Sequence, residues 1–398
     1  MAVKTDFKTV AADSAELDEL NDKIRTHRHK NIRRVAIAVV AFVVVLVGVQ
    51  LGFALRSYTS FEVTAQIAQQ DSSASKYEAY LGNVLEYNND GIVCKNTENE
   101  LIWNQSFEMS TPTLTSCDRY LAVYDRGGTS IYIIAEKGVV HKIEMTIPIN
   151  SVCIASQGTV AVLMKEDNVS YVRLYDKKGK ELAGGEFYEE KESFPVDIAL
   201  SSDGEKLAMD MLDVTEGKVR STISFYNFGS VGQNEIDNNV GTYSYDDMFF
   251  PEIEYMGTDR MVALSDRGFI IFEGKQKPAP KKEVQFEGQM QSVFHNNRYI
   301  GVTYSSPQKE GFWHIKVYDM NGNVVMENDT SLAYSRIEFL DNNEICVRDE
   351  YSCEIFTIHS IRKFSYTFDK ELYRILSGGD ASTYTFILKG EIDEVRLR

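Results

Sequence analysis

The residues of this sequence that could do chemistry are mainly acidic, and one group of them could bind a cation. Asp246, Asp247, Glu252 and Glu254 occur close together in SYDDMFFPEIEYM, the longest interruption of an otherwise repeating pattern. Carboxylate oxygens are the ligands that Ca²⁺ prefers in proteins. An acidic loop in an acidic protein is the alternative interpretation, so the segment gives a hypothesis and not an assigned site.

The histidines form no recognisable metal-binding or catalytic motif. Four follow the N-terminal region, singly and without the short spacings that place two imidazoles on one metal: His141, His295, His314 and His359. The sequence also contains no nucleophile elbow, phosphate-binding loop or dinucleotide fingerprint. We therefore predict no catalytic residue, no cofactor-binding residue, no metal ligand and no cofactor, and we do not expect an enzyme.

Two of the five cysteines are spaced so that a disulfide could join them. If Asp349 and Glu350 form the centre of a hairpin in EICVRDEYSCEI, Cys346 and Cys353 lie directly opposite each other. A bond between them would form only in an oxidising compartment. Two small buried thiols are the alternative.

These residues follow an uncharged apolar run at residues 35–55, which predicts one transmembrane helix. Twenty-one helical residues match a hydrocarbon core of about 30 Å. Basic residues are frequent before the run and rare after it, so the N-terminus should be cytoplasmic and the remainder extracytoplasmic, at the cell membrane. A cleaved signal peptide is the alternative, but the 34-residue head and the long run argue against it.

The run divides the chain into four predicted parts. Residues 1–34 form a basic cytoplasmic head, 35–55 the transmembrane helix, 56–79 a juxtamembrane spacer, and 80–398 the extracytoplasmic domain. The net charge of the whole chain is −17. Because the head is basic, the negative charge lies on the outer part, which makes nucleic acid an unsuitable partner.

A repeat of about forty residues fills the extracytoplasmic part and predicts an all-β fold. Each unit has four short strands with turn residues between them, and an incomplete unit stands at each end. If the two ends complete one shared blade, the fold is a seven-bladed β-propeller; if each forms its own blade, it has eight. We favour seven, because a shared blade locks the ring. An open solenoid would need capping ends that this sequence lacks.

Several motifs resemble known propeller repeats. SSDGEKLAMD at 201–210 is similar to the turn and strand of WD40-like blades, and DGIVCKNTENELIW at 90–103 is similar to quinoprotein-like blades. With YTSFEV at 58–63 and YDRGGTSIYII at 124–134, the whole chain resembles a bacterial family of single-pass membrane proteins with a propeller ectodomain. That resemblance implies a fold and a location, and no activity.

The expected function is therefore binding. A propeller offers a rigid surface of loops, on which a protein, a peptide or a cell-envelope polymer could bind. Two alternatives stay open: a hydrolase or lyase with a metal or carboxylates at the channel mouth, and a transmembrane sensor or structural anchor. The expected partners are the lipid bilayer, through residues 35–55, and a protein or envelope ligand.

Overall fold

The computed structural model describes residues 33, 35–45, 48, 56–68, 75–189, 193–215, 217–306 and 308–398. They belong to two compact units, Met1–Arg56 and Ser57–Arg398. In the first unit, the described residues 33, 35–45 and 48 are helical. Among the described residues, no helix is both long and apolar enough to span a membrane. The rest of the predicted span at 35–55 lies outside the described residues, so the span stays a prediction.

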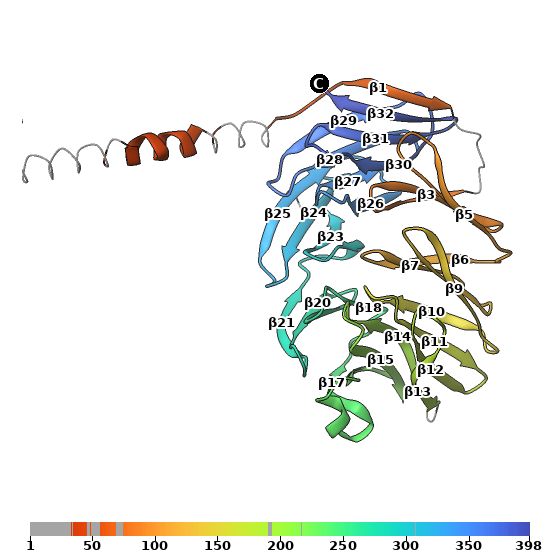
Figure 1. Cartoon of the computed structure of the whole chain (residues 1–398). Coiled ribbons are helices and arrows are strands. Elements are labelled where there is room, and N and C mark those ends of the chain that lie inside the picture. The colour runs from red at the N-terminus through yellow and green to blue at the C-terminus, as the bar shows by residue number, and fades with distance from the viewer. Residues whose placement is uncertain are drawn as a thin grey trace, which may run out of the picture. The chain divides into compact units, whose positions relative to one another are not determined.

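The second unit is an all-β propeller of eight four-stranded antiparallel blades (Figure 1). Blades 1 to 4 consist of β2 (Lys76–Tyr80), β3 (Asn83–Asn88), β4 (Gly91–Lys95), β5 (Leu101–Ser106); β6 (Pro112–Cys117), β7 (Tyr120–Asp125), β8 (Ser130–Ala135), β9 (Gly138–Glu144); β10 (Ile149–Ile154), β11 (Val160–Glu166), β12 (Val169–Tyr175), β13 (Glu181–Tyr188); and β14 (Ser193–Leu200), β15 (Lys206–Thr215), β16 (Lys218–Asn227), β17 (Asn239–Asp246).

Blades 5 to 8 continue in the same order around the ring. They consist of β18 (Glu252–Tyr255), β19 (Arg260–Leu264), β20 (Gly268–Glu273), β21 (Ala279–Gln285); β22 (Met290–His295), β23 (Tyr299–Ser305), β24 (Trp313–Asp319), β25 (Val324–Thr330); β26 (Arg336–Phe339), β27 (Ile345–Arg348), β28 (Ser352–Phe356), β29 (Arg362–Thr367); and β30 (Leu372–Ser377), β31 (Thr383–Leu388), β32 (Glu391–Leu397) with β1 (Phe61–Ala68). Two 3₁₀ turns, η1 (Gly232–Asn234) and η2 (Ile236–Asn238), join β16 to β17.

The prediction of seven blades was wrong by one, because each end of the repeat forms its own blade. Blade 1 is complete, since β2 supplies the opening strand that the sequence pattern did not reveal. Blade 8 takes its outer strand from the N-terminal side of the propeller, where β1 pairs with β32 from Phe61–Leu397 to Ala68–Glu391. The ring is therefore locked by strands from both ends, as expected for a closed propeller, but without merging two blades into one.

The segment 56–79, predicted to be a spacer, in fact supplies β1 and most of β2. The backbone N–H of Tyr58 already donates to the carbonyl of Lys363 at 2.7 Å, and the Phe61 ring packs edge-on against Tyr366 and Phe386, with centroids 4.9 and 5.2 Å away. Most side chains of β1 are exposed, because it is an outer strand. An outer strand lacks the apolar alternation on which the sequence prediction relied.

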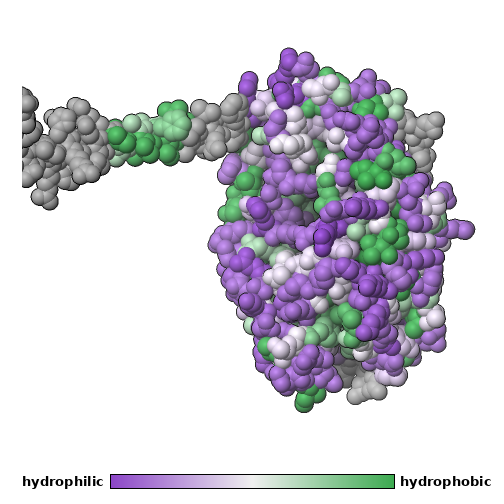
Figure 2. Space-filling model, viewed as in Figure 1, coloured by the Kyte–Doolittle hydropathy of each residue, from purple (hydrophilic) through white to green (hydrophobic). Residues whose placement is uncertain are grey.

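The hydrophobic core lies between neighbouring blades. The second and third strands of each blade are apolar on both faces, since each face packs against another sheet; Val160, Ala161, Val162 and Leu163 of β11 are all buried. Residues of adjacent blades share one cluster at each junction, for example Ile131 of blade 2 with Val160 of blade 3. Figure 2 shows the result on the face in view, which is mostly hydrophilic with hydrophobic residues in separate small patches.

The predicted alignment of Cys346 with Cys353 is wrong by two residues, because the centre of the turn lies one residue further along the chain. The hairpin turns at Asp349–Ser352, where the Asp349 carboxylate accepts from the Ser352 N–H at 2.6 Å, so Cys346 faces Ile355 and Cys353 faces Arg348. Both thiols are buried on one face of blade 7. All five cysteines, each within the described part of the chain, are free. The alternative of two buried thiols is the one observed.

Candidate functional site

The first strand of each blade lies at the inner edge of its sheet, and first strands of neighbouring blades contact each other at several junctions, for example β14 with β18. Charges on these strands are segregated. In blades 1, 7 and 8, Glu78 binds Arg336 at 3.2 Å and Arg374 at 2.7 Å, and Glu338 binds Arg374 at 2.6 Å. The network joins the first blade to the last two. We therefore assign the network a structural role. It holds the ring closed at the inner strands, and β1 does the same at the outer strands.

The opposite part of the inner wall, in blades 4 to 6, is acidic. Asp197 on β14 accepts from the Ile253 N–H at 3.0 Å, and His295 Nε2 lies 2.8 Å from a carboxylate oxygen of Glu252. Glu254 lies on the same face of β18 as Glu252. Burial raises the carboxyl pKa of Asp197 to about 7 and that of Glu254 to about 7.

His295 has a partner that outweighs the effect of its burial. Burial alone lowers an imidazole pKa, because the charged form loses hydration. The hydrogen bond and negative charge of Glu252 act more strongly, so the pKa of His295 is raised and that of Glu252 is lowered. At mildly acidic pH, His295 and Glu252 therefore carry opposite charges, and the neighbouring carboxyls of Asp197 and Glu254 are protonated.

The acidic residues proposed from sequence as a calcium site do not converge. Asp246 ends the outer strand β17 and pairs with Arg220 at 2.6 Å, whereas Asp247 forms the turn that follows. Glu252 and Glu254 belong to the inner strand β18. Across the described ranges, no three His, Cys, Asp or Glu side chains are grouped as metal ligands would be.

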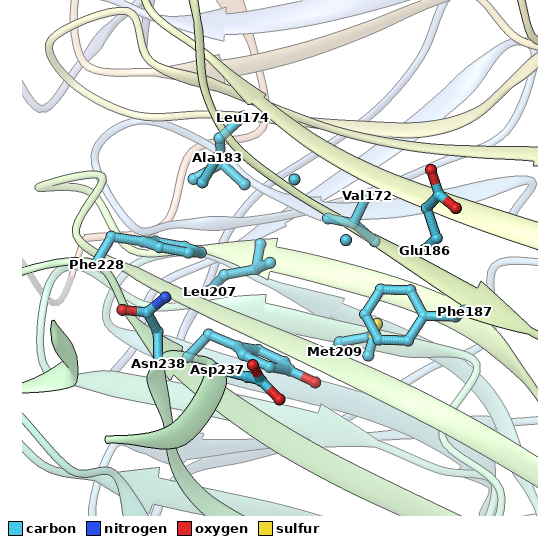
Figure 3. A pocket seen from close by; sticks show the side chains of 13 residues that line it. Val172, Leu174, Ala183, Glu186, Phe187, Leu207, Met209, Phe228, Asp237 and Asn238 are labelled. Carbon is cyan, nitrogen blue, oxygen red and sulfur yellow. The ribbon is translucent and has the colours of Figure 1, made fainter. Parts of the chain in front are cut away.

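A second candidate site is an apolar groove between blades 3 and 4 (Figure 3). It has a volume of about 360 Å³ and is open to solvent. Its floor consists of Val172 and Leu174 from β12 and Leu207 and Met209 from β15, all on neighbouring faces of the two blades. In Figure 3 the side chains of Leu174 and Ala183 lie across the hollow from Asp237 and Asn238 of η2.

The hollow lies beside the small residues of β13, whose large apolar side chain on this face, Phe187, stands one pair further along, opposite Ser170. Opposite Val172 and Leu174 of β12, strand β13 places Gly185 and Ala183. At the equivalent junctions, the outer strands of blades 1, 2, 4, 5, 6 and 7 each supply a large apolar side chain: Trp103, Ile143, Tyr243, Val284, Met326 and Phe364. A missing side chain in a close-packed junction leaves a void.

The mouth of the groove is formed by an unusual turn. Asp237 and Asn238 of η2 both have left-handed backbones, with φ of 54° and 57°, a conformation that Asp and Asn tolerate better than other non-glycine residues. Ile236, next to them, is 86% exposed, the highest value among the large hydrophobic residues of the described propeller. On the other side, Glu186 of β13 lies 3.4 Å from Arg173. The groove thus has an apolar floor and a rim with more acidic than basic groups.

The sequence analysis did not identify this groove. Its signal is the pair Gly184-Gly185 inside the strand segment ELAGGEFY, since glycine in a strand interior marks a bulge or a close approach of another group. The aligned repeats alone do not show which face of β13 the glycines occupy. That information comes from the register of β12 with β13.

The fold defines an eight-bladed β-propeller with WD40-like repeats, the class of fold that the repeats predicted. The chain belongs to DUF5711, a family of unknown function whose sequence model matches residues 54–397. No curated protein matches it.

Solved structures with a similar fold include BamB from Moraxella catarrhalis, at 10% identity and a TM-score of 0.48, covering 85% of this chain and 100% of BamB. A eukaryotic initiation factor is similar at 14% identity and a TM-score of 0.49, covering 83% of each chain. The Pan2 WD40 domain of Neurospora crassa is similar at 9% identity and a TM-score of 0.42, covering 85% and 95%.

Proposed function

We propose that this protein is a membrane-anchored, extracytoplasmic scaffold that binds another protein or peptide and does not catalyse a reaction. The observation that carries the proposal is the groove between blades 3 and 4. Six other junctions of the ring are filled by a large side chain at the equivalent position, and this one is open and lined by apolar residues. Concave apolar sites with a few polar groups at the rim are the usual form of a binding site.

The propeller is suited to be a scaffold because two separate sets of contacts close its ring. Strand β1 closes the outer wall and the ion pairs of Glu78 with Arg336 and Arg374 close the inner wall. A rigid frame reduces the entropy lost on binding, so contacts at a groove contribute more of their energy to affinity.

The proposed anchor is the apolar run at 35–55, with the head inside the cell. Only Arg56 and Ser57 separate the end of that run from Tyr58, which is already bound to the propeller. Alkaline extraction of membranes tests the anchor: the full chain should stay in the pellet, and a chain lacking residues 35–55 should be released.

Site-specific photo-cross-linking in cells tests the binding function. A photoreactive amino acid in place of Ala183, in the groove, should form a discrete adduct with one partner. The same residue in place of Ala279, on the outer strand β21, is the matched control and should form none. Identical adducts from both positions, or no adduct from position 183, would contradict a binding role for the groove.

A second candidate function rests on the acidic part of the inner wall. Carboxyls that titrate near neutral pH, beside a paired imidazole in a confined space, are suited to general acid–base catalysis. The residues for this role would be Asp197 and Glu254, with His295 oriented by Glu252. A panel of chromogenic esters, glycosides and phosphoesters tests it: turnover that Glu254→Gln abolishes would favour an enzyme, and no turnover of any substrate favours binding.

A further inference from the structure

We propose that the outer edge of β13 takes an extended, alternately apolar peptide of a partner protein, with at least one Lys or Arg, as a fifth strand of blade 3. This inference deepens the proposed binding function and rests on it. The edge strand, the groove beside it and the charge of the rim each support it.

β13 is an edge whose backbone another strand can approach. It ends the order β10-β11-β12-β13, and none of the strands described in the structure pairs with its outer side. Its centre is Gly184-Gly185, so two consecutive residues offer backbone without side chains. Natural proteins protect such edges with Pro and Lys, as in β21, where Pro280, Lys281 and Lys282 follow one another. The segment ELAGGEFY of β13 contains neither residue type.

Both faces of β13 leave apolar surface uncovered. On the face toward blade 4, Ala183 and Gly185 border the groove of about 360 Å³, which lies within the usual range of about 300–1,000 Å³ for ligand sites. On the other face, Leu182 is 53% and Tyr188 is 66% exposed. A strand added to the edge sends alternate side chains to the two faces. It would therefore fill the groove with one set and cover Leu182 and Tyr188 with the other.

The charge of the surroundings selects a basic peptide. Among the described ion pairs, Glu181 and Glu186 on β13 share one partner, Arg173, at 3.6 and 3.4 Å, and none involves Asp237 at the groove mouth. These four groups leave two negative charges uncompensated. The chain as a whole carries −17, which also favours a basic partner. Main-chain hydrogen bonds would supply affinity, and the groove and the rim charges would supply specificity.

The test uses the full chain in detergent micelles and three fluorescein-labelled nonapeptides, followed by fluorescence anisotropy. The first has the alternating sequence Lys-Thr-Val-Thr-Tyr-Thr-Val-Thr-Lys. The second is a scramble that breaks the alternation, and the third has Glu for both Lys. We expect binding of the first peptide, at least tenfold weaker binding of the other two, and slower hydrogen exchange at the β13 amides in the first complex.

Substitutions test whether the peptide binds at the groove beside β13. Ala183→Leu fills the hollow and should weaken binding of the first peptide at least tenfold, whereas Ala279→Leu on β21 should leave it unchanged. Because a core change can disturb folding, the pair Glu186→Gln and Asp237→Asn provides a second test at the surface, and Asn tolerates the left-handed backbone at 237. This pair should reduce the preference for Lys over Glu peptides about fivefold.

Four results would overturn the proposal. In the first, the alternating peptide does not bind at concentrations up to millimolar; in the second, the scrambled peptide binds equally well. In the third, the peptide binds but the β13 amides exchange no more slowly. In the fourth, the β13 amides become protected as the protein concentration is raised without any peptide. The last would assign the edge to a second copy of this chain. Because the photo-cross-linking from position 183 is independent of these peptides, a partner captured there without β13 protection would refute the strand and leave the binding function standing.

Discussion

Asp210 should make the propeller less stable as the pH rises from about 4 to 7. Its side chain is fully buried in β15, and its Oδ2 accepts a hydrogen bond from Ser221 at 3.2 Å. No described donor reaches its Oδ1. Burial raises the carboxyl pKa to about 7 from a usual value of 3.8, with a further rise from the charge of Asp197. The folded state therefore holds a proton that the unfolded state releases.

The magnitude follows from linkage. The raised pKa stabilises the fold fully below pH 3.8, and this contribution is lost as the pH rises through 7. A difference of about three pKa units at about 1.36 kcal/mol each gives a loss on the order of 4 kcal/mol. Asn cannot ionise, so Asp210→Asn should match the parent only near pH 3, exceed it by about 1.6 kcal/mol at pH 5 and exceed it by about 4 kcal/mol at pH 8.

Thermal unfolding followed by circular dichroism, at pH 5 and pH 8, measures this difference. With an unfolding entropy of about 2.1 cal/mol/K per residue, 4 kcal/mol corresponds to a Tm increase of about 5 °C at pH 8 for a domain of roughly 340 residues. Asp266→Asn, at an exposed turn position, is the matched control and should change Tm by less than 1 °C or so. An equal Tm shift for Asp210→Asn at both pH values would refute the reasoning.

Three further predictions concern closure of the ring and the buried thiols. Phe61→Ala should cost about 2 kcal/mol in urea unfolding, because its ring joins β1 to blades 7 and 8; no loss would mean that β1 does not lock the ring. Arg374→Ala should cost about 3 kcal/mol and Arg374→Met less, since both lose the ion pairs with Glu78 and Glu338 but alanine also uncovers these half-buried carboxylates; equal losses would contradict this. Burial raises the pKa of Cys346 to about 12 and that of Cys353 well above its usual value, so both thiols should resist alkylation at pH 8 until the protein unfolds, and non-reducing mass spectrometry should find both free.

The repeat in the sequence was sufficient to predict a propeller, because the central strands of each blade are buried on both faces and read as apolar runs. Outer strands gave no such signal, so β1 was taken for a spacer and the blade number came out one too low. The pairing of Cys346 with Cys353 failed for a related reason: a shift of the turn by one residue changes every cross-strand pair.

The candidate sites depended on three-dimensional information that the sequence does not contain. Asp197 and His295 are nearly a hundred residues apart and reach the same part of the inner wall only because blades 4, 5 and 6 pack side by side. The groove depends on which face of β13 carries Gly185, and this is a property of the strand register. The glycine itself is visible in the sequence. That the outer strands of other blades carry large side chains at their junctions becomes clear only when the blades are compared in three dimensions.

The central claim is that a partner protein occupies the edge of β13 while the chain is in its native membranes. Hydrogen exchange of the intact chain tests it most directly, by comparing its native membranes with the purified protein. The amides of residues 183–187 should exchange more slowly in the membranes, and those of residues 281–284 on β21 should exchange equally in both. Equal exchange at 183–187 in the two preparations would contradict the claim.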